Sequence, residues 1–300
     1  MSKPYLRFED GKISLGGKDL DVSSASLSLN PSLEPERVYG DYDAAIAGAK
    51  TEFVKHAAVS PLRGQLEIKF LINSDKFTTN NIDKLFDIRN GMNGDAIHGN
   101  IVGRYFFDNM YLKSFSFSLS PYSVIEASAS YDIFGSVKKT SERRFNITNL
   151  NIAHGLKSFG EMKANNQSAD NISGQFEISS LQYSIQVNRK VHYHIRGSEH
   201  SSVATTANGA LPARVSLENI EAEMSVESNE IIPNLNPYGD YQSGTTVDGL
   251  SSASLSAFLY TLQGDKVAKF SCTGKIQSES LSISEGQYAK GNLTIREIIK

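Results

Sequence analysis

The chain has 300 residues, of which 39% are hydrophobic and 21% charged, and its formal net charge is −3. This composition excludes wholesale disorder, and it argues against a protein that grips nucleic acid, which needs clustered Lys and Arg. Cys272 is the only cysteine, so we expect neither an internal disulfide nor a cysteine metal cluster. The N-terminus carries no apolar signal segment, and no later window approaches the roughly 20 apolar residues that span a bilayer. We therefore expect a protein made in the cytoplasm, with no membrane partner.

Most of the chain alternates apolar and small polar residues with a period of two, which indicates half-buried strands. In chain order, the N-terminus is expected to open as hairpins, with turns at Asp10-Gly11 and Gly16-Gly17. A short helix is predicted from Thr79 to Gly91, because Thr79 or Asn80 can cap its first amides and the glycine can close its end. The fold is therefore predicted to be mainly β, with one or two short helices.

The segment Asp41–Ser60 is too long for a simple hairpin, and its apolar residues follow no fixed period. Long loops inside compact domains are usually functional. We expect this loop to reach a neighbouring subunit or the next ring, where its apolar side chains become buried. Two further tyrosines lie beside a second Gly-Asp turn, in PYGDYQ. The residues expected to contact another subunit are Tyr42, Ile46, Phe53, Val54, Tyr238 and Tyr241.

The clearest strand is Ser114–Ser120, in which serines alternate with large apolar residues. Phe115, Phe117 and Leu119 fall on one face of this strand, and we expect that face to be buried. A turn follows, and a return strand ends at Tyr131. This serine-rich hairpin is the strongest local signal in the sequence.

The same organisation occurs twice along the chain. Val22–Gly40 and Ile178–Gly197 share a Ser-Ser pair, the alternation, an Arg and a final Gly. The hairpin Ser114–Tyr131 is echoed by Ser280–Ile295 in the same order. Preserved order favours a duplication. We therefore expect Leu281 and Ile283 to be buried as deeply as the apolar face of the first hairpin.

The duplication predicts two tandem β-sandwich or β-barrel domains, at residues 1–144 and 173–300. A linker at residues 145–172, rich in Asn, Ser and charge, would join them. The only dense basic run ends the first domain and is interpreted as a solvated surface rather than a nucleic-acid site. Its members are Lys138, Lys139, Arg143 and Arg144.

No motif for catalysis is present, because the sequence lacks both a G-x-S-x-G elbow and a nucleotide-binding loop. The best metal candidate is VHYHIRGSEH, where His192 and His194 share one strand face and His200 follows a turn. A zinc site needs a third ligand and a supporting shell, so partly exposed strand histidines are the preferred interpretation. We expect no catalytic residue, no cofactor and no metal.

The segment Phe107–Gly135 resembles the late strand, turn and return strand of the phage tail tube proteins, whose fold is shared with the inner tubes of contractile injection systems. Ile178–Gly197 and the following segment Leu211–Ser228 look like the long early strands of that family. The resemblance implies a β-sandwich or barrel whose sheets join those of neighbours into a continuous inner wall. Most members have one such domain and form sixfold rings.

The resemblance further implies a structural protein of the virion tail, assembled in the bacterial cytoplasm. Its partners would be copies of itself and other tail proteins, such as sheath, terminator or baseplate. Two units per chain imply that three chains complete a ring with pseudo-sixfold symmetry, whereas six are needed if only one unit lines the channel. DNA would pass through the lumen without tight binding. The alternatives are a tube adaptor, terminator or baseplate-hub ring, a capsid-decoration or tail-fibre module and, last, an enzyme.

Overall fold

The computed structural model describes a set of segments that covers most of the predicted strands. These are residues 13–20, 22–29, 33–38, 53–58, 63–72, 86, 97–101, 105–120, 125–134, 137–139, 164–167, 173–176, 179–192, 212, 214–229, 252–260 and 266–299. Strands form nearly all of this part of the chain, and no helix occurs in it. The prediction of a mainly β fold is therefore confirmed.

The strands of the first half precede residue 140. They are β1 (Ile13–Leu15), β2 (Lys18–Leu20), β3 (Val22–Leu29), β4 (Leu33–Val38), β5 (Phe53–Ala58), β6 (Gly64–Leu71), β7 (Ile97–Ile101), β8 (Tyr105–Leu119), β9 (Glu126–Ile133) and β10 (Val137–Lys139). The strands of the second half are β11 (Ala164–Gln167), β12 (Ser173–Phe176), β13 (Ser180–His192), β14 (Arg214–Ser228), β15 (Ser252–Tyr260), β16 (Lys266–Ser282) and β17 (Lys290–Ile299).

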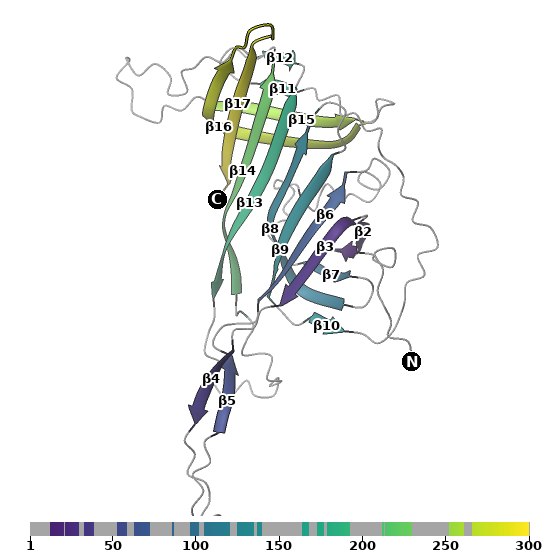
Figure 1. Cartoon of the computed structure of the whole chain (residues 1–300), viewed down its shortest axis with the longest axis vertical. Coiled ribbons are helices and arrows are strands. Elements are labelled where there is room, and N and C mark those ends of the chain that lie inside the picture. The colour runs from purple at the N-terminus through teal and green to yellow at the C-terminus, as the bar shows by residue number, and fades with distance from the viewer. Residues whose placement is uncertain are drawn as a thin grey trace, which may run out of the picture.

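A single antiparallel sheet of 13 strands joins the two halves. Its longest path runs β3-β6-β9-β8-β13-β14-β17-β16-β15, and β7, β10, β1 and β2 extend it beside the first part of β8. The long strands lie side by side, while β15 and part of β16 cross over them (Figure 1). Two hairpins, β4–β5 and β11–β12, form separate two-stranded sheets.

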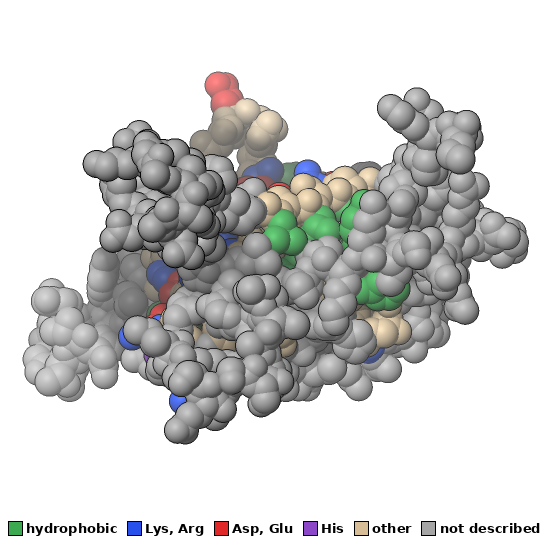
Figure 2. Space-filling view, turned by 90° about the horizontal axis from the view of Figure 1, so that it is seen from below, with side chains coloured by type: hydrophobic (Ala, Val, Ile, Leu, Met, Phe, Trp, Pro, Cys, Tyr) green, Lys and Arg blue, Asp and Glu red, His purple; other side chains and the backbone are tan. Residues whose placement is uncertain are grey.

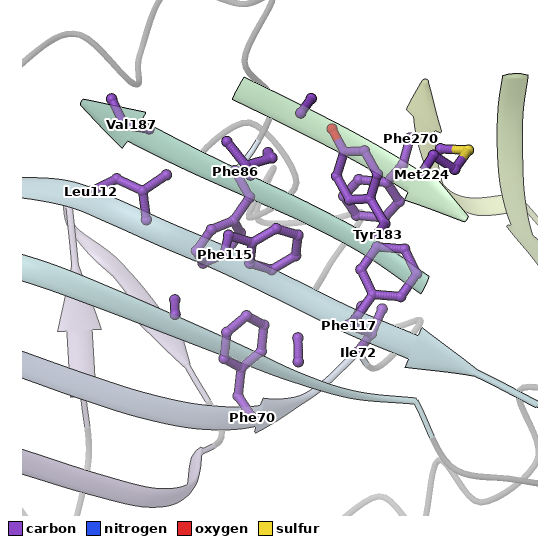
Figure 3. Close-up of a cluster of buried hydrophobic side chains, with 14 of the residues drawn as sticks. Phe70, Ile72, Phe86, Leu112, Phe115, Phe117, Tyr183, Val187, Met224 and Phe270 are labelled. Atoms are coloured by element: carbon purple, nitrogen blue, oxygen red, sulfur yellow. The ribbon is translucent and has the colours of Figure 1, made fainter. Parts of the chain in front are cut away.

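The core lies on one face of the long strands, because alternate residues point to opposite sides of a sheet. Phe115 is fully buried, with ring centroids 4.4 Å from Phe86 and 5.8 Å from Phe270. Phe117 lies 4.7 Å from Phe270 and 5.6 Å from Tyr183. Figure 3 shows these rings close together; Phe115 and Phe117 belong to β8, Tyr183 to β13 and Phe270 to β16, and Phe86 lies in a turn. The prediction that the Phe face of the serine-rich strand is buried is confirmed.

Because these rings come from both halves of the chain, the halves share one hydrophobic core. The division into domains at residues 144 and 173 stays a prediction. Part of the expected linker forms a strand, since β11 lies within residues 145–172 and pairs with β12. Of the expected helix, only Phe86 is among the described residues, where it is buried in a turn.

Three further expectations from the sequence can be compared with the structure. The turn at Gly16-Gly17 joins β1 and β2 as predicted, with positive φ at both glycines. The long loop 41–60 was predicted without secondary structure, but its end forms β5, which pairs with β4 along LEPERV. Leu281 and Ile283 were expected to be buried, and this is wrong: they are 42% and 73% exposed. Leu281 pairs only with Gly291 of β17 among the described residues, so the other edge of β16 is open there, and Ile283 lies just beyond the end of β16.

Tyr131 provides a test of the core. Its hydroxyl is buried without a hydrogen-bond partner, and burial raises the pKa of the phenol. A buried hydroxyl without a partner destabilises the folded state. We expect Tyr131→Phe to raise the free energy of unfolding by about 1 kcal/mol, measured by urea denaturation. A clear loss of stability would show that the hydroxyl has a partner after all.

Candidate assembly interface

The order of strands in the sheet repeats. In the first half the strands that follow one another as β3, β6, β8 and β9 lie in the spatial order β3-β6-β9-β8. In the second half β13, β14, β16 and β17 lie in the order β13-β14-β17-β16. The partial strands match as well, since β7 pairs with the first part of β8 and β15 pairs with the first part of β16. Five strands of the first half, β3, β6, β7, β8 and β9, therefore have counterparts in the second.

The hydrogen-bond registers identify counterparts residue by residue. Leu27 lies opposite Leu66, which lies opposite Tyr131. In the second half, Tyr183 lies opposite Met224, which lies opposite Ile295. If Tyr131 and Ile295 are matched, as the sequence repeat suggests, Leu27 corresponds to Tyr183 and Ala25 to Leu181. This agrees with the alignment of Val22 with Ile178 made from the sequence.

A β-bulge marks the same place in the two late hairpins. The register shifts between Leu112 and Ser114 in the β8–β9 ladder and between Ile276 and Ser278 in the β16–β17 ladder. A bulge bends its strand, and in both halves it separates the part of the strand that crosses from the part that joins the long strands. Matching the bulges places Phe117 against Leu281 and Leu119 against Ile283.

A local hydrogen bond is also repeated. The Ser23 hydroxyl donates to the Lys69 carbonyl over 3.2 Å, and the Ser179 hydroxyl donates to the Glu227 carbonyl over 2.9 Å. Each serine hydroxyl is also within hydrogen-bond distance of a carboxylate, which belongs to Glu126 in the first half and to Glu227 in the second, so its single proton is shared between the two acceptors. The ammonium of Lys290, and then the hydroxyl of Ser179, hold the pKa of Glu227 below its ordinary value. The sequence signal for this contact was the repeated Ser-Ser pair.

The two halves meet where β8 pairs with β13. Leu119 lies opposite Leu181, and Phe117 lies opposite Tyr183, with all four side chains buried on the core face. Ser116 lies opposite Ser184 on the other face. We call this ladder, from Ser114–Gln186 to Leu119–Leu181, the internal joint.

Arg189 secures the internal joint beyond its last paired residues. Its guanidinium donates to the Leu112 carbonyl and lies 5.2 Å above the ring of Tyr111. Partial burial lowers the pKa of Arg189, although an arginine still keeps its charge. The joint therefore combines a backbone ladder, an aromatic core and a cation–π contact.

The counterparts of β8 and β13, which are the part of β16 after its bulge and β3, form two of the open edges of the sheet. Among the described residues β3 pairs only with β6, and the part of β16 after its bulge pairs only with β17. Ala25 is exposed and Leu27 half-buried at the first edge, and Leu281 and Ile283 are exposed at the second. Figure 2 shows hydrophobic side chains at the surface, among other side chains and backbone. The residues at these two edges are thus exposed or half-buried, whereas their counterparts in the internal joint are paired and buried.

The other face of the sheet is polar and hollowed. A depression of about 300 Å³ lies over the internal joint, and short polar side chains from four neighbouring strands line it together with two glutamates and a lysine. The residues are Lys69, Ser116, Ser118, Glu126, Ser128, Gln182, Ser184, Glu223 and Ser225. This surface carries no basic stripe, so it offers no built site for a phosphate backbone.

The remaining predicted site residues are not brought together in the described segments. Phe53 and Val54 lie on β5, whose hairpin with β4 stands apart from the main sheet (Figure 1). Tyr42, Ile46, Tyr238, Tyr241, His194 and His200 lie outside the described residues. His192 Nε2 is 3.1 Å from the Ser216 hydroxyl. No group of metal-ligating side chains occurs in the part of the chain that the structure describes. The described segments contain no helix that could span a membrane.

Comparison with known proteins does not assign the chain to a family. No protein-family model matches the sequence, and no curated protein matches it either.

Proposed function

We propose that the chain is a structural subunit of a bacteriophage tail tube, in which copies join edge to edge into rings that stack around a channel. The observation that carries this proposal is the pair of open edges whose counterparts already pair inside the chain. An open antiparallel edge exposes unpaired backbone groups, and joining it to a neighbour's edge satisfies them. Because the two edges differ, the contact between copies is head to tail and can close into a ring.

The repeated strand order supports two tube-like β-sandwich or barrel units per chain, at residues 1–144 and 173–300. In the family that the sequence resembles, six units close a ring. Three chains then complete the circuit with pseudo-sixfold symmetry. The internal joint supplies every second contact around the ring, and the contact between chains supplies the others.

On this proposal the protein belongs to the virion tail, has no enzymatic activity and meets sheath, terminator or baseplate proteins at the surface or ends of the tube. An adaptor, terminator or baseplate-hub ring would use the same edges without stacking on itself. Electron microscopy of the purified protein, over a series of rising concentrations, tests the proposal. We expect rings or stacked tubes. Monodisperse single chains at every concentration would overturn it.

The polar face of the sheet is proposed to line the channel. Its serines and glutamates, among them Ser116, Ser184 and Glu223, offer few cations to a passing duplex. Nonspecific DNA affinity scales with the number of phosphates that Lys and Arg neutralise. We expect binding of duplex DNA to the assembled tube to be weaker than about 10⁻⁶ M at physiological salt. Fluorescence anisotropy with a labelled duplex measures this, and tighter binding would contradict a passive channel.

The β4–β5 hairpin is proposed to contact the next ring, because it projects away from the sheet (Figure 1). Leu29 lies opposite Gly64 at the base of the hairpin, so an Asn-Gly turn can replace residues 30–63. We expect this variant to form single rings that no longer stack, as seen by electron microscopy. Tubes of ordinary length in the variant would contradict the role of the hairpin.

A further inference from the structure

We infer that the second part of β16 in one copy, continued by one residue to Ile283, pairs with β3 of the next copy in one fixed register, with Leu281 opposite Leu27 and Ile283 opposite Ala25. The inference rests on the proposed ring and specifies its contact between chains. The register is obtained by replacing each residue of the internal joint with its counterpart in the other half of the chain. In that joint, Phe117 pairs with Tyr183, whose counterparts are Leu281 and Leu27.

The side chains brought together by this register agree on both faces of the sheet except at Glu279, which would lie opposite Leu29. On the core face, Leu281 would lie against Leu27, which is half-buried in a single chain, and Ile283 against the exposed Ala25. On the polar face, Ser280 would lie opposite Ser28, as Ser116 lies opposite Ser184 in the internal joint. A slip of one residue would place serines opposite leucines, because successive side chains alternate between faces. The pattern of both edges therefore excludes odd slips, and the register of the internal joint selects one of the even ones.

The contact between chains is expected to be weaker than the internal joint. Leu281 replaces Phe117, Leu27 replaces Tyr183, and the position of Phe115 is taken by Glu279, so the aromatic cluster has no counterpart. Less apolar area is therefore buried between chains than within one. The chain can fold first, and the ring closes afterwards.

Cysteine pairs test the register in the full-length chain. Residues directly opposite have Cβ atoms about 4.5–5.5 Å apart, whereas diagonal neighbours are about 7–8 Å apart, too far for a disulfide. The in-register variants are Ser28→Cys with Ser280→Cys and Leu27→Cys with Leu281→Cys, which sample both kinds of antiparallel pair. The matched control is Ser26→Cys with Ser280→Cys, two residues out of register. Cys272 is buried and stays unchanged in every variant.

After oxidation of the assembled protein, non-reducing electrophoresis should show covalently linked dimers and trimers for at least one in-register variant and single chains for the control. The two edges lie at opposite ends of the strand path, so a link within one chain cannot form. Rings in the microscope with no in-register link, or with the control linked instead, would overturn the register while leaving the proposed function standing. Absence of rings from the unmodified chain and all variants would overturn both.

Discussion

Replacing Phe115 by alanine is expected to lower the free energy of unfolding by about 3–5 kcal/mol, the usual range for a fully buried phenylalanine. The Phe115 ring stacks on Phe86 and on Phe270, so its removal leaves a cavity bordered by both halves of the chain. Urea denaturation followed by circular dichroism measures the change. We expect one transition, shifted to lower urea, because the halves share this core.

Ser118→Ala is the matched control for this prediction. Ser118 lies on the same strand but is exposed on the polar face, so its replacement should change the free energy of unfolding by less than about 0.5 kcal/mol. If Phe115→Ala behaved like the control, the described core would be wrong. Two separate transitions in the unmodified chain would show that the halves unfold independently.

Leu281→Lys is expected to abolish ring formation while leaving the single chain as stable as before. Leu281 is 42% exposed in one chain, so a lysine there can reach water and costs little. In the assembled ring the same side chain would be placed against Leu27, where an unpaired ammonium is strongly unfavourable. Analytical ultracentrifugation should show single chains at concentrations where the unmodified protein forms rings.

Tyr288→Lys separates this effect from a general effect of added charge. Tyr288 is 84% exposed in the connection between β16 and β17, beyond the residues inferred to pair with β3. The Tyr288→Lys variant should assemble normally. Rings of unchanged stability in Leu281→Lys would place the interface elsewhere on the molecule.

Alternation with a period of two predicted the strands well, because one buried face forces apolar residues to every second position. The buried residues Phe115 and Phe117 and the turn at Gly16-Gly17 were found in this way. The segment LEPERV does not alternate, so β4 was not predicted from it. Its pairing with β5 places it in a hairpin outside the main sheet.

The sequence predicted only part of the candidate interface. The repeats aligned Val22 with Ile178, and the ladders agree with this. They also aligned Ser114 with Ser280, which would match Phe115 to Leu281, whereas the bulges match Phe117 to Leu281, a difference of two residues. The burial of Leu281 was nevertheless wrongly predicted, since burial depends on a neighbouring strand and not on the strand's own pattern. The pairing of β8 with β13 was not predicted either, because local periodicity carries no information on which distant strands meet.

The inferred assembly explains why a chain would keep two open edges, which are otherwise a liability for aggregation. Pairing the edges in the order seen inside the chain satisfies the unpaired backbone groups of both edges at once. The register that sets Leu27 opposite Leu281 excludes random association. Serines on the polar face of both joints keep the channel side free of bulky groups.

The measurement that tests the central claim most directly is the mass of an isolated ring, determined by native mass spectrometry. Each chain has a mass of 32.9 kDa. If each chain supplies two units joined by the β8–β13 ladder, the ring contains three copies. A ring of six copies would contradict the tandem arrangement, because only one unit of each chain could then line the channel.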